Sequence, residues 1–174
     1  MPDFEKCCLT RFPAPVLAQV AKPIEEITDD IRTLAGKMID LMIETKGVGM
    51  AAPQVGVNLR IFVASPDGTK ENAKVYINPT IERSGPLETY EEGCLSLPGI
   101  YAKIKRHKNC SITATDLDGN IFTEQAEGLT VRIFQHEFDH LEGMLIKDRM
   151  SRVAGIAARK KLKHLQDQYQ EDQS

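Results

Sequence analysis

The segment His136-Glu137-Phe138-Asp139-His140 carries the strongest chemical signal in the sequence. Residues four apart on an α-helix lie one turn apart on the same face, so the two imidazoles can bind one metal ion. Glu137 can reach a metal-bound water without filling a ligand position, as in metal-dependent hydrolases. Two hydrogen-bonded core histidines are the plainer alternative, but a chain with four histidines rarely pairs them this way by chance. We therefore predict a metal site.

A catalytic metal needs a third protein ligand and one open coordination position. Two classes of protease take that ligand from beyond the helix, but Ile146 stands where one of them requires histidine and only Glu171 is available for the other. The third ligand therefore lies upstream or is His164. Among the upstream candidates Cys94 stands out, because a glycine precedes it and frees the backbone. Cys110 begins a strand and is predicted to be a small core residue.

The elements that must position these side chains follow from the hydrophobic pattern. The predicted elements are a helix over 28–45, strands over 60–65, 74–81, 109–115 and 121–126, and helices over 128–142 and 151–169. Thr28 is a suitable N-cap, and Gly47 and Gly143 are placed to end helices. The order indicates an α+β fold with antiparallel β-sheets packed around the metal-binding helix, between an N-terminal and a C-terminal helix. We expect one domain over 1–169 and a frayed polar tail over 170–174.

Composition narrows the functional class. The chain has 174 residues, of which 41% are hydrophobic and 27% charged, and a formal net charge of −3. These values fit one globular domain and give no indication of binding to DNA or to an anionic membrane. No apolar run approaches the roughly 18 residues of a membrane span. The first eight residues resemble neither a signal nor a transit peptide, so the four cysteines are expected to be reduced thiols.

Three segments in order resemble the motifs of the peptide deformylase family. Gly47–Gly56 is similar to the first motif, Glu92–Ser96 to the second, and Gln135–Leu141 matches the third. The resemblance extends from about Phe12 to the last helix. It implies a metallohydrolase that removes the formyl group from the N-terminal formyl-methionine of newly made bacterial and organellar polypeptides, releasing formate.

The resemblance also implies the metal ligands. They would be Cys94, His136 and His140, with the fourth position open to water. The usual metal of the family is Fe²⁺, here one per chain, and Zn²⁺ typically gives a weaker enzyme. A thiolate and two imidazoles suit either ion or another divalent metal. Glu92 is expected either to support a ligand from behind or to be a solvated carboxylate.

The expected catalytic residues are Glu137, Gln54 and Leu95. Glu137 would accept a proton from the attacking water and return it to the departing amine. The oxyanion that forms needs hydrogen-bond donors placed where its charge develops. The resemblance assigns this task to the Gln54 side-chain amide and the Leu95 backbone N–H. Outside the motif, Gln54 would be interpreted as an ordinary loop residue.

The methionine side chain of such a substrate needs an apolar slot. Candidate walls, from their spacing, are Val48, Leu129 and Ile133. Arg132 lies beside them and is expected to point away. The backbone at Gly47 and Gly49 is expected to lie against the peptide, because glycine permits close approach. Helix termination is the alternative explanation for both glycines.

Two alternatives remain at the level of sequence. One is a zinc endopeptidase, which lacks a well-placed ligand after the helix. The other is a binding module with a structural metal, closed by a fourth ligand from among Cys7, Cys8, Cys110, His107 and His164. For the deformylase interpretation we expect a monomer that meets nascent polypeptides near the ribosome exit. The expected compartment is the bacterial cytoplasm, or an organelle if a leader was removed.

Overall fold

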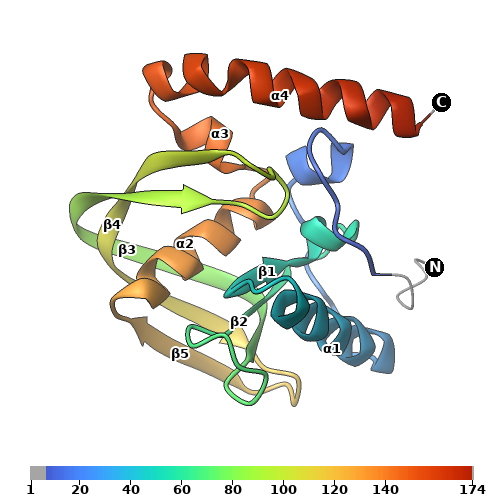
Figure 1. Ribbon diagram of the computed structural model, residues 1–174. Coiled ribbons are helices and arrows are strands. Elements are labelled where there is room, and N and C mark those ends of the chain that lie inside the picture. The colour runs from blue at the N-terminus through green and yellow to red at the C-terminus, as the bar shows by residue number, and fades with distance from the viewer. Residues whose placement is uncertain (1–6, 174) are drawn as a thin grey trace.

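A computed structural model describes residues 7–173 and shows two long strands that curve around a central helix (Figure 1). The elements in chain order are the 3₁₀ turn η2 (Pro15–Ala18), α1 (Asp29–Glu44), β1 (Gly49–Ala51), the 3₁₀ turn η3 (Ala52–Val55), β2 (Ile61–Ala64), β3 (Lys74–Gly93), β4 (Tyr101–Thr115), β5 (Ile121–Ala126), α2 (Leu129–Leu141), α3 (Ile146–Arg149) and α4 (Arg152–Asp172). The α+β class predicted from the sequence is confirmed.

The strands of the described residues form one five-stranded sheet in the order β1-β2-β3-β4-β5, with every neighbouring pair antiparallel. The sequence prediction of several sheets is corrected to this single sheet. The predicted strand 74–81 covers only the first part of β3, and the predicted strand 109–115 covers only the last part of β4. The ladder between them shifts register between Ile77 and Thr80 and again between Ser84 and Leu87. Such irregularities bend strands and interrupt the alternation on which the prediction relied.

Strand β2 is buried on both faces, which explains its uninterrupted apolar sequence. Ile61 and Val63 belong to the apolar cluster that α1 closes with Leu34, Met38 and Met42. Phe62 and Ala64 belong to the opposite cluster, which α2 closes with Ile133 and Phe134. The Phe62 ring stacks on Tyr76 with centroids 4.6 Å apart, and Phe134 meets Tyr76 edge-on at 5.0 Å. The sheet therefore holds α1 and α2 on opposite faces.

Helix α1 begins and ends close to the predicted positions, but its caps differ from the prediction. Thr28 is the N-cap residue, yet its side chain makes no capping hydrogen bond. At the other end Lys46, not Gly47, has the left-handed backbone, with φ of 55°. The Gly47 N–H donates to the Met42 carbonyl at 2.8 Å. This turn leads the chain directly into β1.

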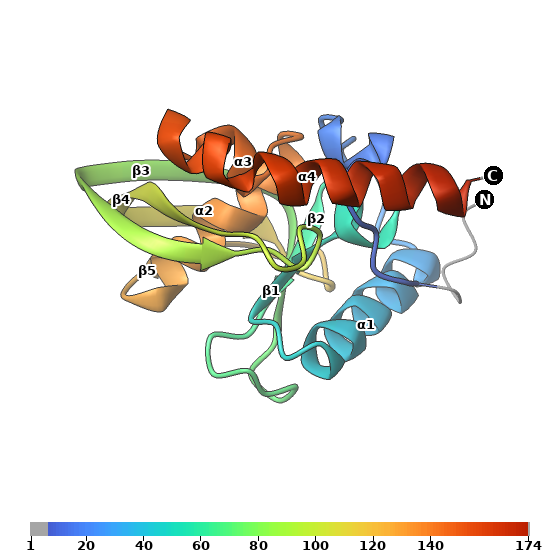
Figure 2. The same cartoon turned by 45° about the horizontal axis from the view of Figure 1, so that its top comes forward.

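Helix α4 lies across the top of the molecule in Figure 1 and at the front in Figure 2, and it packs on the segment between β3 and β4. Its buried Leu165 packs in one cluster with Leu97, Ile104 and the α3 residue Ile146. Lys161 donates a hydrogen bond to the Gly99 carbonyl at 2.7 Å. The helix runs to Asp172, three residues beyond its predicted end at 169 and into the predicted polar tail. The short helix α3 was not predicted from the sequence.

Gly143 is expected to be required for stability. It ends α2 with φ of +71°, and a Cβ there would lie 2.9 Å from the backbone C and O atoms of Ala18. Gly143→Ala should lower the free energy of unfolding by more than about 1 kcal/mol, measured by urea denaturation. Gly36→Ala is the matched control, because Gly36 lies in α1 with open space around it. The control should stabilise by about 0.4–1 kcal/mol. Equal behaviour of the two variants would contradict this explanation.

Candidate metal centre

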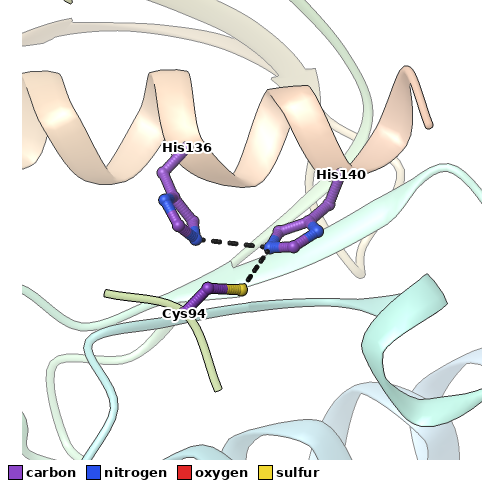
Figure 3. A group of neighbouring side chains, drawn as sticks. All are labelled: Cys94, His136 and His140. Carbon is purple, nitrogen blue, oxygen red and sulfur yellow. Dashed lines mark hydrogen bonds between the residues drawn. The ribbon is translucent and has the colours of Figure 1, made fainter. Parts of the chain in front are cut away.

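Cys94, His136 and His140 point their ligand atoms at one another (Figure 3). The two histidines lie one turn apart on α2, and Cys94 follows the last residue of β3. His140 Nε2 lies 3.3 Å from His136 Nε2 and 3.5 Å from Cys94 Sγ. Within residues 7–173 this is the one group of three or more His, Cys, Asp or Glu side chains with convergent ligand atoms.

The spacing of these atoms fits a metal ion. Bonds of about 2.0–2.1 Å to nitrogen and about 2.3 Å to sulfur at tetrahedral angles separate the ligand atoms by roughly 3.3–3.6 Å. The two measured separations, 3.3 and 3.5 Å, agree with that range. The donor set of one thiolate and two imidazoles suits Fe²⁺ or Zn²⁺. The residues present therefore fit the metal that the sequence pattern implies.

The other candidate ligands lie elsewhere. His164 is exposed on α4, and the His107 Nδ1 atom lies 3.3 Å from the Gly85 carbonyl in the β3–β4 hairpin. Cys110 is buried as predicted, and burial raises the pKa of its thiol to about 11. No disulfide joins the four cysteines. Neither these side chains nor Cys7 and Cys8 belong to the metal cluster, so the described residues offer it three ligands and no fourth.

A chain of charged side chains supports His136 from behind, of which Glu92, Arg106 and Asp139 are buried and Arg149 is exposed. The His136 Nδ1 atom lies 3.1 Å from Glu92 Oε2, and Arg106 donates two hydrogen bonds of 2.9 Å to the same carboxylate. Arg106 also reaches Asp139 at 2.6 Å, and Arg149 closes the chain with two bonds to Asp139. Burial alone would raise the pKa of Glu92, but the bonds from Arg106 and His136 outweigh it and lower the pKa to about 2.

The ionised Glu92 carboxylate can only accept hydrogen bonds, so His136 Nδ1 must carry the proton. The Nε2 lone pair of His136 then faces the cluster, in the tautomer that metal binding needs. The sequence left Glu92 open between support of a ligand and exposure to solvent. The structure shows that Glu92 is buried and that it supports the His136 ligand.

Glu137 is buried beside the cluster, with 4% of its surface exposed. Its Oε2 atom has no hydrogen-bond partner among residues 7–173. Burial raises the pKa of this carboxyl to about 7. The side chain occupies the place where a Cβ on Gly49 would stand, since that atom would lie 2.5 Å from Glu137 Oε1. Gly49 is thus needed to make room for the carboxylate.

Two further hydrogen-bond donors lie at the same place. The Gln54 side chain is buried, and its Oε1 atom accepts from the Ala51 N–H at 2.9 Å. This bond orients the amide so that Nε2 points to Cys94 Sγ at 3.8 Å and to Ser96 Oγ at 3.5 Å. The backbone N–H of Leu95 donates to no acceptor among the described residues. The Leu95 N–H is therefore free to donate to a ligand in the cavity, and the Gln54 amide is held there only by two long hydrogen bonds.

A cavity of about 570 Å³ opens beside the cluster. The predicted site residues that line it are Gly47, Val48, Gly49, Gln54, Cys94, Leu95, Leu129, Ile133, His136 and Glu137. Ile133 is buried in its wall, whereas Leu129 is 42% exposed at its rim. The cavity therefore joins an apolar region to the metal cluster, with a buried carboxylate between them.

The sequence matches the family model for polypeptide deformylase over residues 7–155. The chain belongs to the peptide deformylase family. It is 43% identical over 155 residues to the peptide deformylase of Pseudomonas aeruginosa, covering 88% of this chain and 92% of the relative. It is also 43% identical over 166 residues to the chloroplastic peptide deformylase 1B of rice, covering 94% of this chain. The chain spans 62% of the rice relative's length.

Solved deformylase structures share the fold closely. A peptide deformylase from Plasmodium falciparum superposes with a TM-score of 0.92 at 37% identity, covering 96% of this chain and 99% of that one. Peptide deformylase 1B of Arabidopsis thaliana, in complex with an inhibitor, gives 0.90 at 38% identity, with 94% and 92% covered. The fold that holds the Cys-His-His cluster here is thus the deformylase fold.

One cavity residue contradicts the sequence prediction. Arg132 was expected to point away, but it lines the cavity. Its guanidinium lies 4.4 Å from the centroid of the Tyr90 ring. The sequence did contain an indication of this orientation, because Arg132 lies four residues before His136 and hence on the same helical face.

Gly49→Ala is expected to displace the Glu137 carboxylate, because the new Cβ would overlap it. If Glu137 acts in catalysis as the sequence predicts, the variant should lose at least about tenfold in kcat, since small misplacements of a catalytic group are costly. Formate release and metal content of the purified protein measure the two effects, and the metal content should stay at the wild-type level. Gly36→Ala serves as the control. Wild-type kcat in Gly49→Ala would show that the carboxylate has room to move.

Glu92→Gln is expected to weaken metal binding by about 10–100-fold, because a neutral amide supports the His136 imidazole less well than a carboxylate. Competition with a chelator measures the affinity. Glu91→Gln is the matched control, because Glu91 is the exposed neighbour on the same strand. If the two variants bind metal equally, Glu92 does not tune the ligand.

Proposed function

We propose that this chain hydrolyses the formyl group from the N-terminal formyl-methionine of newly synthesised polypeptides and releases formate. One observation carries the proposal. A Cys-His-His cluster, the buried carboxylate of Glu137 and the amide of Gln54 meet in one cavity that is otherwise largely apolar. This arrangement combines a water-activating centre with a slot for an unbranched apolar side chain. Membership in the deformylase family supports the same reaction.

In this proposal Cys94, His136 and His140 hold one Fe²⁺, with Zn²⁺ or another divalent ion as a substitute. The ion supplies Lewis acidity and makes a neighbouring water acidic enough to lose a proton near neutral pH. The thiolate favours the softer divalent ions over Mg²⁺ or Ca²⁺. Glu92 keeps the His136 imidazole in the tautomer that this role requires.

Glu137 acts as general base and then as general acid. Its carboxylate accepts the proton of the attacking water and later delivers it to the amine that leaves the formyl carbon. The Gln54 Nε2 group and the Leu95 N–H donate hydrogen bonds to the formyl oxygen as it gains negative charge. The bond from Ala51 fixes the Gln54 amide in this orientation before substrate arrives. Little reorganisation is then needed during the reaction.

The methionine side chain occupies the slot formed by Val48, Leu129 and Ile133, next to the backbone at Gly47 and Gly49. Methionine is flexible enough to fill an irregular apolar space. A charged side chain would lose its hydration against these apolar walls, which is costly. The slot therefore accounts for selection of formyl-methionine over formyl-aspartate.

The setting in the cell follows from the proposed substrate. Formylated nascent chains occur in bacteria and in organelles, and we propose that the chain acts there as a monomer, near the ribosome exit. In residues 7–173 no helix is long and apolar enough to cross a membrane.

The decisive experiment measures formate released from an amidated formyl-Met-Ala-Ser peptide. The protein is stripped with a chelator and reloaded anaerobically with Fe²⁺ or with Zn²⁺. We expect activity with both ions, more with iron, and none without metal. Cys94→Ser should lose the metal, whereas Cys110→Ser should keep it, because Cys110 lies outside the cluster. No formate from either loaded form would overturn the proposed function.

Glu137→Gln is expected to keep the metal and lose about 10²–10⁴-fold in turnover, because an amide of nearly equal size cannot accept the water proton. Metal analysis and formate release on one preparation test both halves. Activity above a tenth of wild type at equal metal content would argue against Glu137 as the base.

The iron-loaded protein is expected to lose activity in air. An Fe²⁺ ion held by only Cys94, His136 and His140 would be accessible to O₂, as would the Cys94 thiolate, and thiolates can be oxidised to sulfenic or sulfinic acid. The zinc-loaded protein should resist, because Zn²⁺ has no redox chemistry. Activity against time of exposure and mass spectrometry of the Cys94 peptide measure the effect. An iron-loaded protein that stays fully active would contradict the choice of iron.

A further inference from the structure

The guanidinium of Arg132 places a positive charge at the wall of the cavity. This residue lies on α2, half-buried, and its guanidinium stacks over the Tyr90 ring at 4.4 Å. Tyr90 is itself held in place, since it pairs with Ile104 across β3 and β4 and its hydroxyl donates to Glu88. An arginine stacked in this way keeps the edges of its planar group free for hydrogen bonding. The cation is therefore both fixed and available.

The guanidinium has no anionic partner within residues 7–173. No carboxylate oxygen lies within 4.0 Å of it, and none of its N–H groups donates a hydrogen bond to a described residue. Arg106 and Arg149, by contrast, are fully engaged with Glu92 and Asp139. Arginine donors that line a cavity without an internal acceptor point to an acceptor on the ligand.

The other charges of the cavity do not compete for this role. Glu92 is committed to Arg106 and His136, and Glu137 is buried next to the metal cluster. Glu91 is exposed and lies opposite Lys103 in the β3–β4 ladder. This cross-strand pair has opposite charges, which favours contact between the two side chains. Arg11 also lines the cavity, but it is exposed and no ring holds it. Arg132 is the positioned cation.

Its place on α2 sets which part of a peptide it can meet. Arg132 comes four residues before His136, about 6 Å along the helix axis, and beside Ile133 of the methionine slot. An extended peptide advances about 3.3 Å per residue. Arg132 lines the same cavity as the slot, so a side chain one or two residues after the methionine, about 3–7 Å further along an extended chain, is within reach of its guanidinium.

We propose that Arg132 gives this enzyme a preference for formyl-methionyl peptides with a carboxylate side chain in the first two residues after methionine. The inference rests on the proposed function. A carboxylate matches the planar edge of guanidinium with two oxygens and a full charge, whereas a peptide carbonyl offers one neutral acceptor. The Tyr90 ring pre-orients the cation, which lowers the entropic cost of binding.

The test compares amidated peptides that differ only by Glu or Gln at the second or the third position after the formyl group. We expect the Glu peptide at one of these positions to have a kcat/KM about 3-fold higher, mostly through KM, as is typical of a half-exposed charge pair. The ratio should fall toward 1 in 0.5 M NaCl, because salt screens such pairs. Both kcat/KM values in a ratio are measured on the same protein preparation. An inactive fraction of a partly folded variant therefore lowers both values equally and leaves the ratio unchanged.

The variants distinguish a specific effect of Arg132 from an effect of the protein's overall charge. Arg132→Gln should bring the ratio to about 1, and Arg132→Lys should leave an intermediate value, because lysine keeps the charge but not the planar fork. Arg159→Gln removes an equal charge from the exposed face of α4 and should leave the ratio unchanged. Tyr90→Leu removes the stacking surface and should lower the ratio without removing a charge.

Several outcomes would overturn the inference. These are a wild-type ratio of 1 at both positions, a ratio that survives Arg132→Gln, and a ratio that collapses only in Arg11→Gln. Peptide affinities from fluorescence anisotropy give the same comparison without turnover. If neither peptide yields formate, the proposed function fails, whereas equal affinities for the Glu and Gln peptides defeat the role of Arg132 alone.

Discussion

The metal cluster depends on one buried guanidinium. Arg106 on β4 binds Glu92 near the end of β3 and Asp139 on α2, and it is 3% exposed. Cys94 follows Glu92 by two residues and His140 follows Asp139 directly. Arg106 therefore fixes the strand that carries the thiolate relative to the helix that carries the imidazoles. Removal of one partner from such a buried network typically costs about 3–5 kcal/mol, because it leaves a charge without compensation.

Apolar packing sets the frame in which that network works. Strand β2 is covered on both faces, so α2 meets the sheet at a fixed depth through Phe134 and the stacked pair Phe62 and Tyr76. With the helix held there, the Glu137 carboxylate fits only because Gly49 has no side chain. Tight packing and catalytic geometry are thus the same constraint at this point of the molecule.

Different parts of the cavity lining differ in chemical character. The floor holds the cluster and the buried Glu137, and Ile133 contributes an apolar wall. Arg132 stacked on Tyr90 adds the one positioned cation that the cavity presents to a ligand. Arg132 and Ile133 are consecutive residues of α2, so the apolar wall and the positioned cation come from the same turn of one helix.

The sequence by itself determined the chemistry and the elements with strong local patterns. Two histidines four apart with a glutamate between them define their own geometry once a helix forms, and α1, α2 and β5 were found within a few residues of their ends. Irregular elements were missed, since the bulges in β3 break the alternation that marks a strand. The motif resemblance already implied Cys94 as the third ligand, and the tertiary structure brings its Sγ atom next to the two histidines. That Glu92 is buried behind His136 and that Arg132 faces the cavity came from the tertiary structure alone. Each of these depends on contacts between residues far apart in the chain, and local spacing carries no information about which distant strand a helix face will meet.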